Sequence, residues 1–114
     1  MAYEINGKTI ETTENGYLVT LEEWSEELAT AIAANEGITL SEKAWEIIHY
    51  LRDEYFNNNQ NQPNERTMVK HFKGVWSDLP KVDAKTLYEH FPMGPAKQAG
   101  KIAGLPETKR KGGY

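Results

Sequence analysis

The chain has 114 residues, the length of one small domain. Its 17 acidic and 13 basic side chains give a net charge of −4, and the apolar fraction of 39% allows a modest core under a hydrophilic surface. No apolar run approaches the roughly 20 residues that a membrane span needs, and no signal-peptide pattern opens the chain, so we expect a cytoplasmic protein without membrane attachment. Cysteine is absent, which excludes disulfides, thiolate metal ligands and a cysteine nucleophile.

Charge is distributed unevenly along the chain. Residues 1–56 carry 12 acidic and 3 basic side chains, a net charge of −9, whereas residues 57–114 carry 5 acidic and 10 basic ones, a net charge of +5. The last 22 residues contain one acid, Glu107, and five cations: Lys97, Lys101, Lys109, Arg110 and Lys111. This pattern predicts either separate acidic and basic surfaces, including a basic arm, or two halves that attract each other within a soluble domain.

Two turn signals mark the start of the chain. Residues 3–10 are typical of a short hairpin, because Asn6 and Gly7 suit a type I′ turn in which both central residues take positive φ. Asn15 and Gly16 predict a second turn.

The first helix is expected to open at a capping box formed by Thr20 and Glu23, whose side chains can satisfy each other's backbone amides. Gly37 marks its end, since glycine takes the left-handed conformation that commonly closes a helix. Apolar residues at helical spacing predict the buried face. They are Leu21, Trp24, Leu28, Ala31 and Ile32.

Three further helices are predicted from N-cap residues that precede apolar stripes; the caps are Ser41, Asn64 and Asp83. The stripes comprise Ala44, Trp45, Ile48, Leu51 and Tyr55; then Met68, Val69, Phe72, Val75 and Trp76; then Leu87, Tyr88 and Phe91. We expect the core to be built on Trp24, Leu28, Trp45, Ile48, Leu51, Phe72 and Trp76.

A last helical stretch is predicted from Gly94 and Pro95 through Ala103, because proline tolerates the first helical position. Gly104 is a plausible C-terminal cap, and Pro106 prevents the helix from continuing.

These elements describe a mostly helical α+β fold, in which a small N-terminal β-hairpin precedes a helical bundle. We expect a single domain over residues 1–106, with the hairpin region at 1–18 and the bundle at 20–106. Residues 107–114 are polar and basic with almost no apolar side chain, so we expect a flexible tail. The sequence does not fix the oligomeric state, and we expect a monomer.

The residues offer no catalytic constellation. His49, His71 and His90 lack metal-ligand spacing, and no glycine-rich phosphate-binding loop is present, so we expect no metal, no cofactor and no enzymatic activity. Nucleic-acid binding stays open at this point. Three cations of the third helix, Arg66, Lys70 and Lys73, face away from its apolar stripe, and with the following short helix they suggest a helix-turn-helix-like unit that meets DNA phosphates.

Two motifs near the C-terminus are more specific: FPMGPAKQA at residues 91–99 and IAGLP at 102–106. Together with the two Asn-Gly turns and the segment IIHYLR at 47–52, they resemble the DsrC/TusE/DsvC sulfur-relay family, whose first member was called the gamma subunit of dissimilatory sulfite reductase. The resemblance covers essentially the whole chain. It implies a helical fold with an N-terminal β-hairpin, a helix-turn-helix-like element and a mobile C-terminal arm.

The resemblance further implies a protein that is not an enzyme but carries sulfur on two arm cysteines. These positions fall at Gly100 and Gly113, and the basic residue that follows the first falls at Lys101. Glycine supplies no thiolate. We therefore interpret the chain as a cysteine-less, non-catalytic member that docks on a sulfite reductase or another sulfur-relay partner in a regulatory role. The alternative is a DNA-binding transcriptional regulator.

Partner binding is expected at a positive patch made by Lys97 and Lys101 and along the tail. The tail residues expected to take part are Lys109, Arg110, Lys111 and Tyr114.

Overall fold

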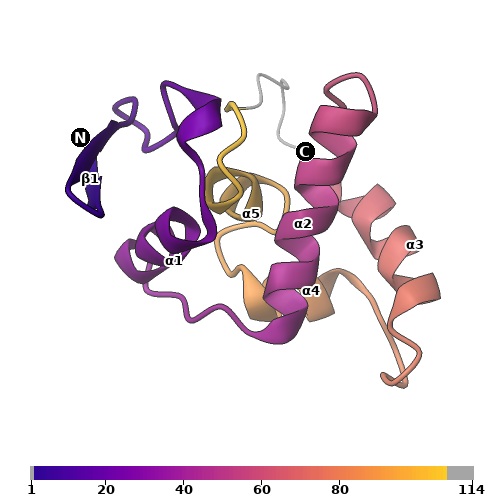
Figure 1. The fold of residues 1–114 in the computed structure, drawn as a ribbon. Coiled ribbons are helices and arrows are strands. Elements are labelled where there is room, and N and C mark those ends of the chain that lie inside the picture. Colours follow the sequence, from indigo (N-terminus) through magenta and orange to yellow (C-terminus); the bar gives the residue numbers. More distant parts are fainter. Residues whose placement is uncertain (1, 108–114) are drawn as a thin grey trace.

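A computed structural model describes residues 2–107, and within them a β-hairpin precedes one 3₁₀ turn and five α-helices (Figure 1). The strands are β1 (Ala2–Ile5) and β2 (Lys8–Glu11), and the 3₁₀ turn η1 is Leu21–Glu23. The helices are α1 (Glu26–Asn35), α2 (Glu42–Asn57), α3 (Glu65–Val75), α4 (Ala84–His90) and α5 (Lys97–Ile102). The prediction of a mostly helical α+β fold is confirmed.

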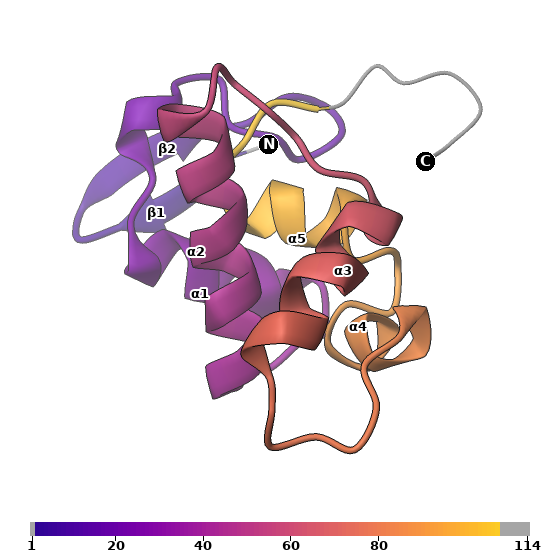
Figure 2. The ribbon, with the colours of Figure 1, turned by 90° about the vertical axis from the view of Figure 1, so that its right-hand side faces the viewer.

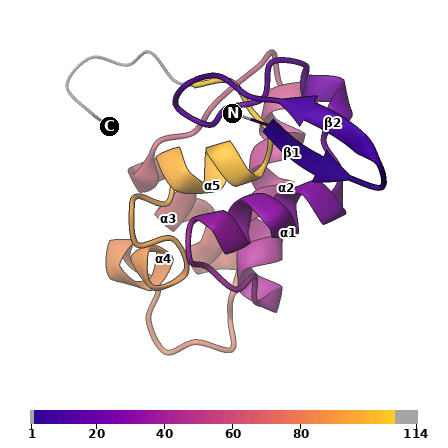
Figure 3. The same cartoon turned by 90° about the vertical axis from the view of Figure 1, so that its left-hand side faces the viewer.

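The hairpin forms as its turn residues predict. β1 and β2 pair antiparallel, with Tyr3 opposite Ile10, and the turn residues Asn6 and Gly7 have φ values of 53° and 79°. Ile10 is buried, and the hairpin packs at the side of the bundle against α1 (Figure 3). The Asn6 side chain also donates to the Glu27 carboxylate of α1, at 3.2 and 3.3 Å. The predicted Asn15-Gly16 turn is also present, with Gly16 at φ 88°.

The first helix begins later than its capping box predicts, and that prediction is wrong. Thr20 precedes only the 3₁₀ turn and makes no side-chain cap bond, whereas Ser25 caps α1 by accepting the Leu28 amide at 3.1 Å. Trp24 is extended, with ψ at 142°, because its indole turns away to bond to the Ile102 carbonyl of α5. A contact with a distant element therefore overrides the local helix signal here.

The other N-caps are confirmed. The side chains of Ser41, Asn64 and Asp83 each accept a backbone amide in the first turn of α2, α3 and α4. α5 is shorter than predicted: it begins at Lys97, since Gly94 lies at φ 122° and the chain through Pro95 forms a turn before the helix.

α5 lies in the middle of the bundle and contacts α1 and α2 (Figure 2). Its residues Ala99 and Ile102 are fully buried, as are the core side chains Leu28, Ile48 and Phe72. Leu51 and Trp76 are also buried, as expected, but Trp24 and Trp45 are only half-buried against the core. Val75 and Tyr88, which the sequence places in apolar stripes, are exposed. Within residues 2–107, no helix combines the length and the apolarity that crossing a bilayer requires.

Candidate functional site at the root of the C-terminal arm

The C-terminal end of α5 is closed by the glycine cap that the sequence predicts. Gly104 has a φ of 74°, its amide donates to the Lys101 carbonyl at 3.1 Å, and the Leu105 amide donates to the Gly100 carbonyl at 3.0 Å. These two bonds define a Schellman motif. We call residues 102–107 the arm root, because they carry the chain from this cap toward the C-terminus.

Two side chains from distant elements bind the arm root. The Trp24 indole Nε1 donates to the Ile102 carbonyl at 2.9 Å, and Arg52 Nη1 of α2 donates to the Ala103 carbonyl at 2.8 Å. These are carbonyls at the end of a helix, which have no partner within the helix itself. The Arg52 guanidinium lies 3.9 Å from the centre of the Trp24 ring, and burial lowers the pKa of Arg52. The arm root therefore leaves the bundle in a defined direction.

Two loops hold the next residues of the arm root. Gln62 Nε2 donates to the Pro106 carbonyl at 2.9 Å, and Asn15 Nδ2 donates to the Glu107 carboxylate at 3.1 and 3.3 Å. The loop after α2 and the Asn15-Gly16 turn thus meet the C-terminal segment at one end of the molecule (Figure 2). The expected tail residues Lys109, Arg110, Lys111, Gly113 and Tyr114, and the predicted mobility there, lie outside the described residues.

The segment 91–99 is organised by a buried glutamine. Gln98 Oε1 accepts the Met93 amide at 2.9 Å, and its Nε2 donates to Glu36 at the end of α1, at 3.0 Å. The Gln98 side chain therefore fixes the turn before α5 and joins it to α1. Because this turn holds Gly94 at φ 122°, a side chain at that position would be strained.

The expected positive patch is smaller than its sequence suggests. Lys101 lies 3.5 Å from the Glu36 carboxylate and 5.4 Å from the centre of the Tyr17 ring, so its charge is largely balanced. Lys97 is exposed and has no acidic partner among the described residues. Two small cavities of about 200 Å³ adjoin this lysine pair, one reaching Asn15 and the other reaching the exposed side chain of Met93.

Gly100, where the resemblance places a cysteine, lies on α5 in the buried interior. A Cβ built at this position would meet nothing within 4 Å. The backbone is therefore compatible with a small side chain there, and the absence of a thiol comes from the residue type and not from a blocked site.

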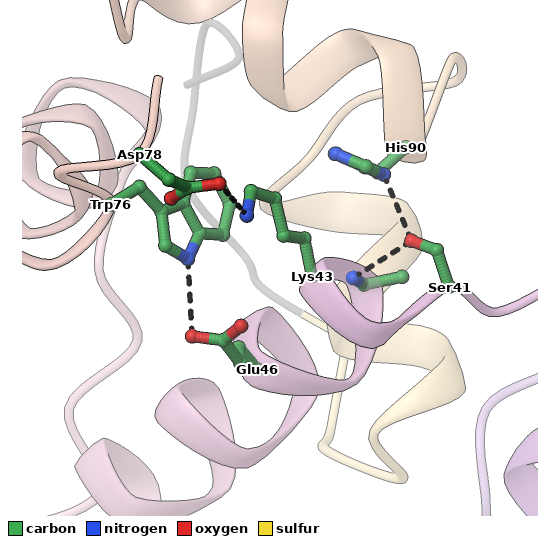
Figure 4. A network of polar contacts seen from close by, with 7 residues as sticks. Ser41, Lys43, Glu46, Trp76, Asp78 and His90 are labelled. Atoms are coloured by element: carbon green, nitrogen blue, oxygen red, sulfur yellow. Dashed lines mark hydrogen bonds and ion pairs between the residues drawn. The ribbon is translucent and has the colours of Figure 1, made fainter.

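The three histidines make separate contacts. His49 stacks on Trp45 and lies 3.3 Å from Glu26, His71 stacks on Tyr50 at 4.1 Å, and His90 Nδ1 lies 3.2 Å from Ser41 Oγ (Figure 4). Within residues 2–107 no three metal-binding side chains come together.

Replacing His90 by Gln is expected to make the protein less sensitive to acid. Burial lowers the pKa of His90 from 6.5, so the unfolded chain takes up this proton first as the pH falls. The stability that neutral His90 supplies is complete above pH 6.5 and is lost as the pH falls toward the lower folded-state pKa. Urea unfolding at pH 7.5 and 5.5 should show a larger loss in the natural protein than in His90→Gln. Equal losses would contradict this, and the exposed His71→Gln is the matched control.

Arg66, Lys70 and Lys73 are exposed on α3, as expected. Eight residues, 76–83, separate α3 from α4, which is longer than the three- or four-residue turn of a DNA-binding helix-turn-helix. No feature of the described residues favours the DNA-binding alternative.

Comparison with known proteins decides the family. The profile of a family described as "DsrC like protein" matches residues 4–110. The chain belongs to the DsrC family. The Sulfurtransferase TusE of Escherichia coli K12 is 48% identical over 101 residues, which cover 89% of this DsrC-family chain and 91% of the relative. The corresponding protein of Sodalis glossinidius is 47% identical over 104 residues, with 91% and 94% covered.

Solved structures of DsrC proteins have the same fold. The oxidised gamma subunit of dissimilatory sulfite reductase from Archaeoglobus fulgidus matches with a TM-score of 0.87 and 38% identity, covering 97% of this chain and 99% of its own. Allochromatium vinosum DsrC matches with a TM-score of 0.83 and 37% identity over the same shares. The chain is therefore a DsrC/TusE-family sulfur-relay protein.

The expectation that the chain is not an enzyme is wrong. Its relatives at 47–48% identity are named sulfurtransferases, after a group-transfer activity. The prediction rested on the lack of a catalytic constellation, on the family resemblance and on the glycines at positions 100 and 113, whereas the similarity to these sulfurtransferases extends over about nine-tenths of both chains.

Sequence reasoning missed most of the residues that build this site. The sequence places Trp24 in the core and does not mark Arg52, Glu36 or Gln62 as site residues. The one available signal for Arg52 was its place at the end of the segment 47–52, which carries part of the family resemblance.

Proposed function

We propose that this DsrC-family protein docks through its arm root on a sulfur-relay partner, a sulfite reductase or another relay protein of the cytoplasm, and regulates sulfur transfer there. The observation that carries this proposal is the fixation of the arm root. Arg52 and Trp24 bind successive carbonyls at the end of α5, while Lys97 and Met93 beside it remain exposed.

The exposed side chains beside the arm root supply the docking chemistry. Met93 is 75% exposed, and a flexible thioether side chain adapts to irregular apolar surfaces. Lys97 adds a cation that lacks an acidic partner among the described residues. A partner surface with an apolar pocket next to a carboxylate fits this pair.

The regulatory part of the proposal follows from composition. The chain has no cysteine, so any sulfur atom transferred within the complex is carried by thiols of the partner. A member that occupies the docking surface without offering its own thiol excludes a cysteine-bearing member from the same surface. Its abundance would then set the rate at which sulfur moves through the relay.

The test is a binding titration of the full chain, and of a version ending at Pro106, against dissimilatory sulfite reductase with a cysteine-bearing relative as competitor. We expect micromolar or tighter binding by the full chain, displacement of the competitor, and weaker binding by the shortened version. Absence of binding at micromolar concentration, or binding without displacement, would reject this partner.

Two single variants localise the contact. Lys97→Gln should weaken binding about two- to fivefold, in line with the 0.2–1 kcal/mol typical of an exposed ion pair. Lys8→Gln removes the same charge from the first residue of β2 and should bind like the natural protein. Equal affinities for all three proteins would place the docking surface elsewhere.

A further inference from the structure

A second surface runs along α3, and the segment that follows α3 lies at the opposite end of the bundle from the arm root (Figures 1 and 2). Arg66, Lys70 and Lys73 stand at positions i, i+4 and i+7 of α3, so they share one helix face. The buried residues Met68 and Phe72 occupy the opposite face. We call this row of three cations the α3 stripe.

The α3 stripe is free to meet a ligand. All three side chains are exposed, and none has an acidic partner among the described residues, where the five ion pairs involve Lys8, Lys43, His49, Lys81 and Lys101. Glu65, the acid on the same helix, accepts a hydrogen bond from the Tyr88 hydroxyl at 2.9 Å. A row of unpaired cations about 10 Å long therefore faces solvent.

The stripe ends in a hollow. Lys73 lines a depression of about 410 Å³, whose other lining residues come from the segment between α3 and α4. They are Trp76, Ser77, Leu79, Pro80, Lys81, Val82 and Asp83. The hollow thus combines an apolar wall with two cations at Lys73 and Lys81. Its one carboxylate, Asp83, already pairs with Lys81 at 3.6 Å and accepts the Thr86 amide.

The wall of the hollow is held in place by α2. Trp76 Nε1 donates to Glu46 at 3.1 Å, and Lys43 binds Asp78 at 2.9 Å while lying 5.4 Å from the centre of the Trp76 ring (Figure 4). These contacts fix both ends of the short segment 76–78. This part of the wall is therefore preformed, which reduces the ordering that a ligand must induce.

We propose that the α3 stripe and this hollow form a docking surface for an acidic peptide segment of a partner protein. Carboxylates of the segment lie along Arg66, Lys70 and Lys73, and an apolar side chain that follows them enters the hollow. A nucleic acid fits less well, because the chain has a net charge of −4 and the stripe ends at an apolar wall instead of continuing as a basic track.

The proposal is tested by NMR titration of the ¹⁵N-labelled full chain with two synthetic six-residue peptides and one 16-base-pair DNA duplex. One peptide has four glutamates followed by leucine and phenylalanine, and the other has serines in place of these two apolar residues. We expect the first peptide to shift the signals of residues 66–82 and to bind at least threefold more tightly than the second. Its affinity should fall as the salt concentration rises.

Matched variants decide between specific docking and general attraction. The triple variant Arg66→Gln, Lys70→Gln, Lys73→Gln should weaken peptide binding about tenfold or more, and Lys70→Gln alone about two- to fivefold. Lys8→Gln removes the same single charge from the hairpin and should leave the affinity unchanged. Signal shifts that leave the α3 stripe and the hollow unaffected, or an unchanged affinity in the triple variant, would overturn the proposal. Tighter binding of the duplex than of either peptide would overturn it in favour of a nucleic-acid surface.

Discussion

Replacing Gly104 by alanine is expected to destabilise the protein by about 2–5 kcal/mol. An L-residue held in the left-handed region costs about 1–2 kcal/mol, and Gly104 lies at φ 74°. The added Cβ would also overlap the Trp24 ring, 2.9 Å from its Cγ, and lie 3.1 Å from a Leu18 methyl carbon. Overpacking of this kind adds about 1–3 kcal/mol. Urea unfolding followed by tryptophan fluorescence measures the sum.

Two other glycines separate these contributions. Gly37 has nearly the same φ, 77°, but a Cβ there meets nothing within 4 Å, so Gly37→Ala should lose only the backbone cost of about 1–2 kcal/mol. Gly100 lies in α5 with open space around its Cβ, so Gly100→Ala should stabilise the helix by about 0.5–1 kcal/mol. A Gly104→Ala loss no larger than that of Gly37→Ala would show that Trp24 does not pack on the glycine.

Replacing Arg52 by alanine is the second large effect, with an expected loss of about 1.5–5 kcal/mol. The substitution leaves the buried Ala103 carbonyl without its side-chain donor, which costs about 1–3 kcal/mol. It also removes the guanidinium from the face of the Trp24 ring, an interaction worth about 0.5–2 kcal/mol. Chemical denaturation gives the total, and amide hydrogen exchange at Leu105 reports whether the arm root opens first.

The matched control for this experiment is Arg66→Ala, which removes an exposed arginine and should change stability by no more than about 0.5 kcal/mol. Arg52→Lys keeps the charge but not the planar guanidinium, so we expect an intermediate loss. If Arg52→Ala cost less than about 1 kcal/mol, the arm root would be held mainly by its backbone cap and by Trp24.

Both predictions concern the same piece of structure. Gly104 lets the chain turn beneath Trp24, and Arg52 holds that turn against α2. A variant that loosens either contact should also weaken docking in the titration against sulfite reductase, because the arm would leave the bundle in many directions. Stability and docking are therefore expected to fall together in these variants. In Lys97→Gln, only docking should weaken.

Short-range signals in the sequence were enough to predict much of the fold. The Asn6-Gly7 turn, the caps at Ser41, Asn64 and Asp83, and the glycine that ends α5 all depend on residues within a few positions of one another. The motifs at 91–99 and 102–106 were enough to identify the family. Residue types and local spacing contain this information directly, because turn and cap chemistry acts over one helical turn.

Only the tertiary structure decided how the candidate site is built. The bonds of Trp24 to Ile102 and of Gln98 to Glu36 join residues that are 78 and 62 positions apart. The first of them explains why the N-cap of α1 is Ser25 and not Thr20. The same packing makes the positive patch smaller than the sequence predicts, because the Glu36 carboxylate pairs with Lys101. Such pairings follow from the packing of α1, α2 and α5 and not from any local pattern, because a long-range contact depends on where the whole chain places each of its partners.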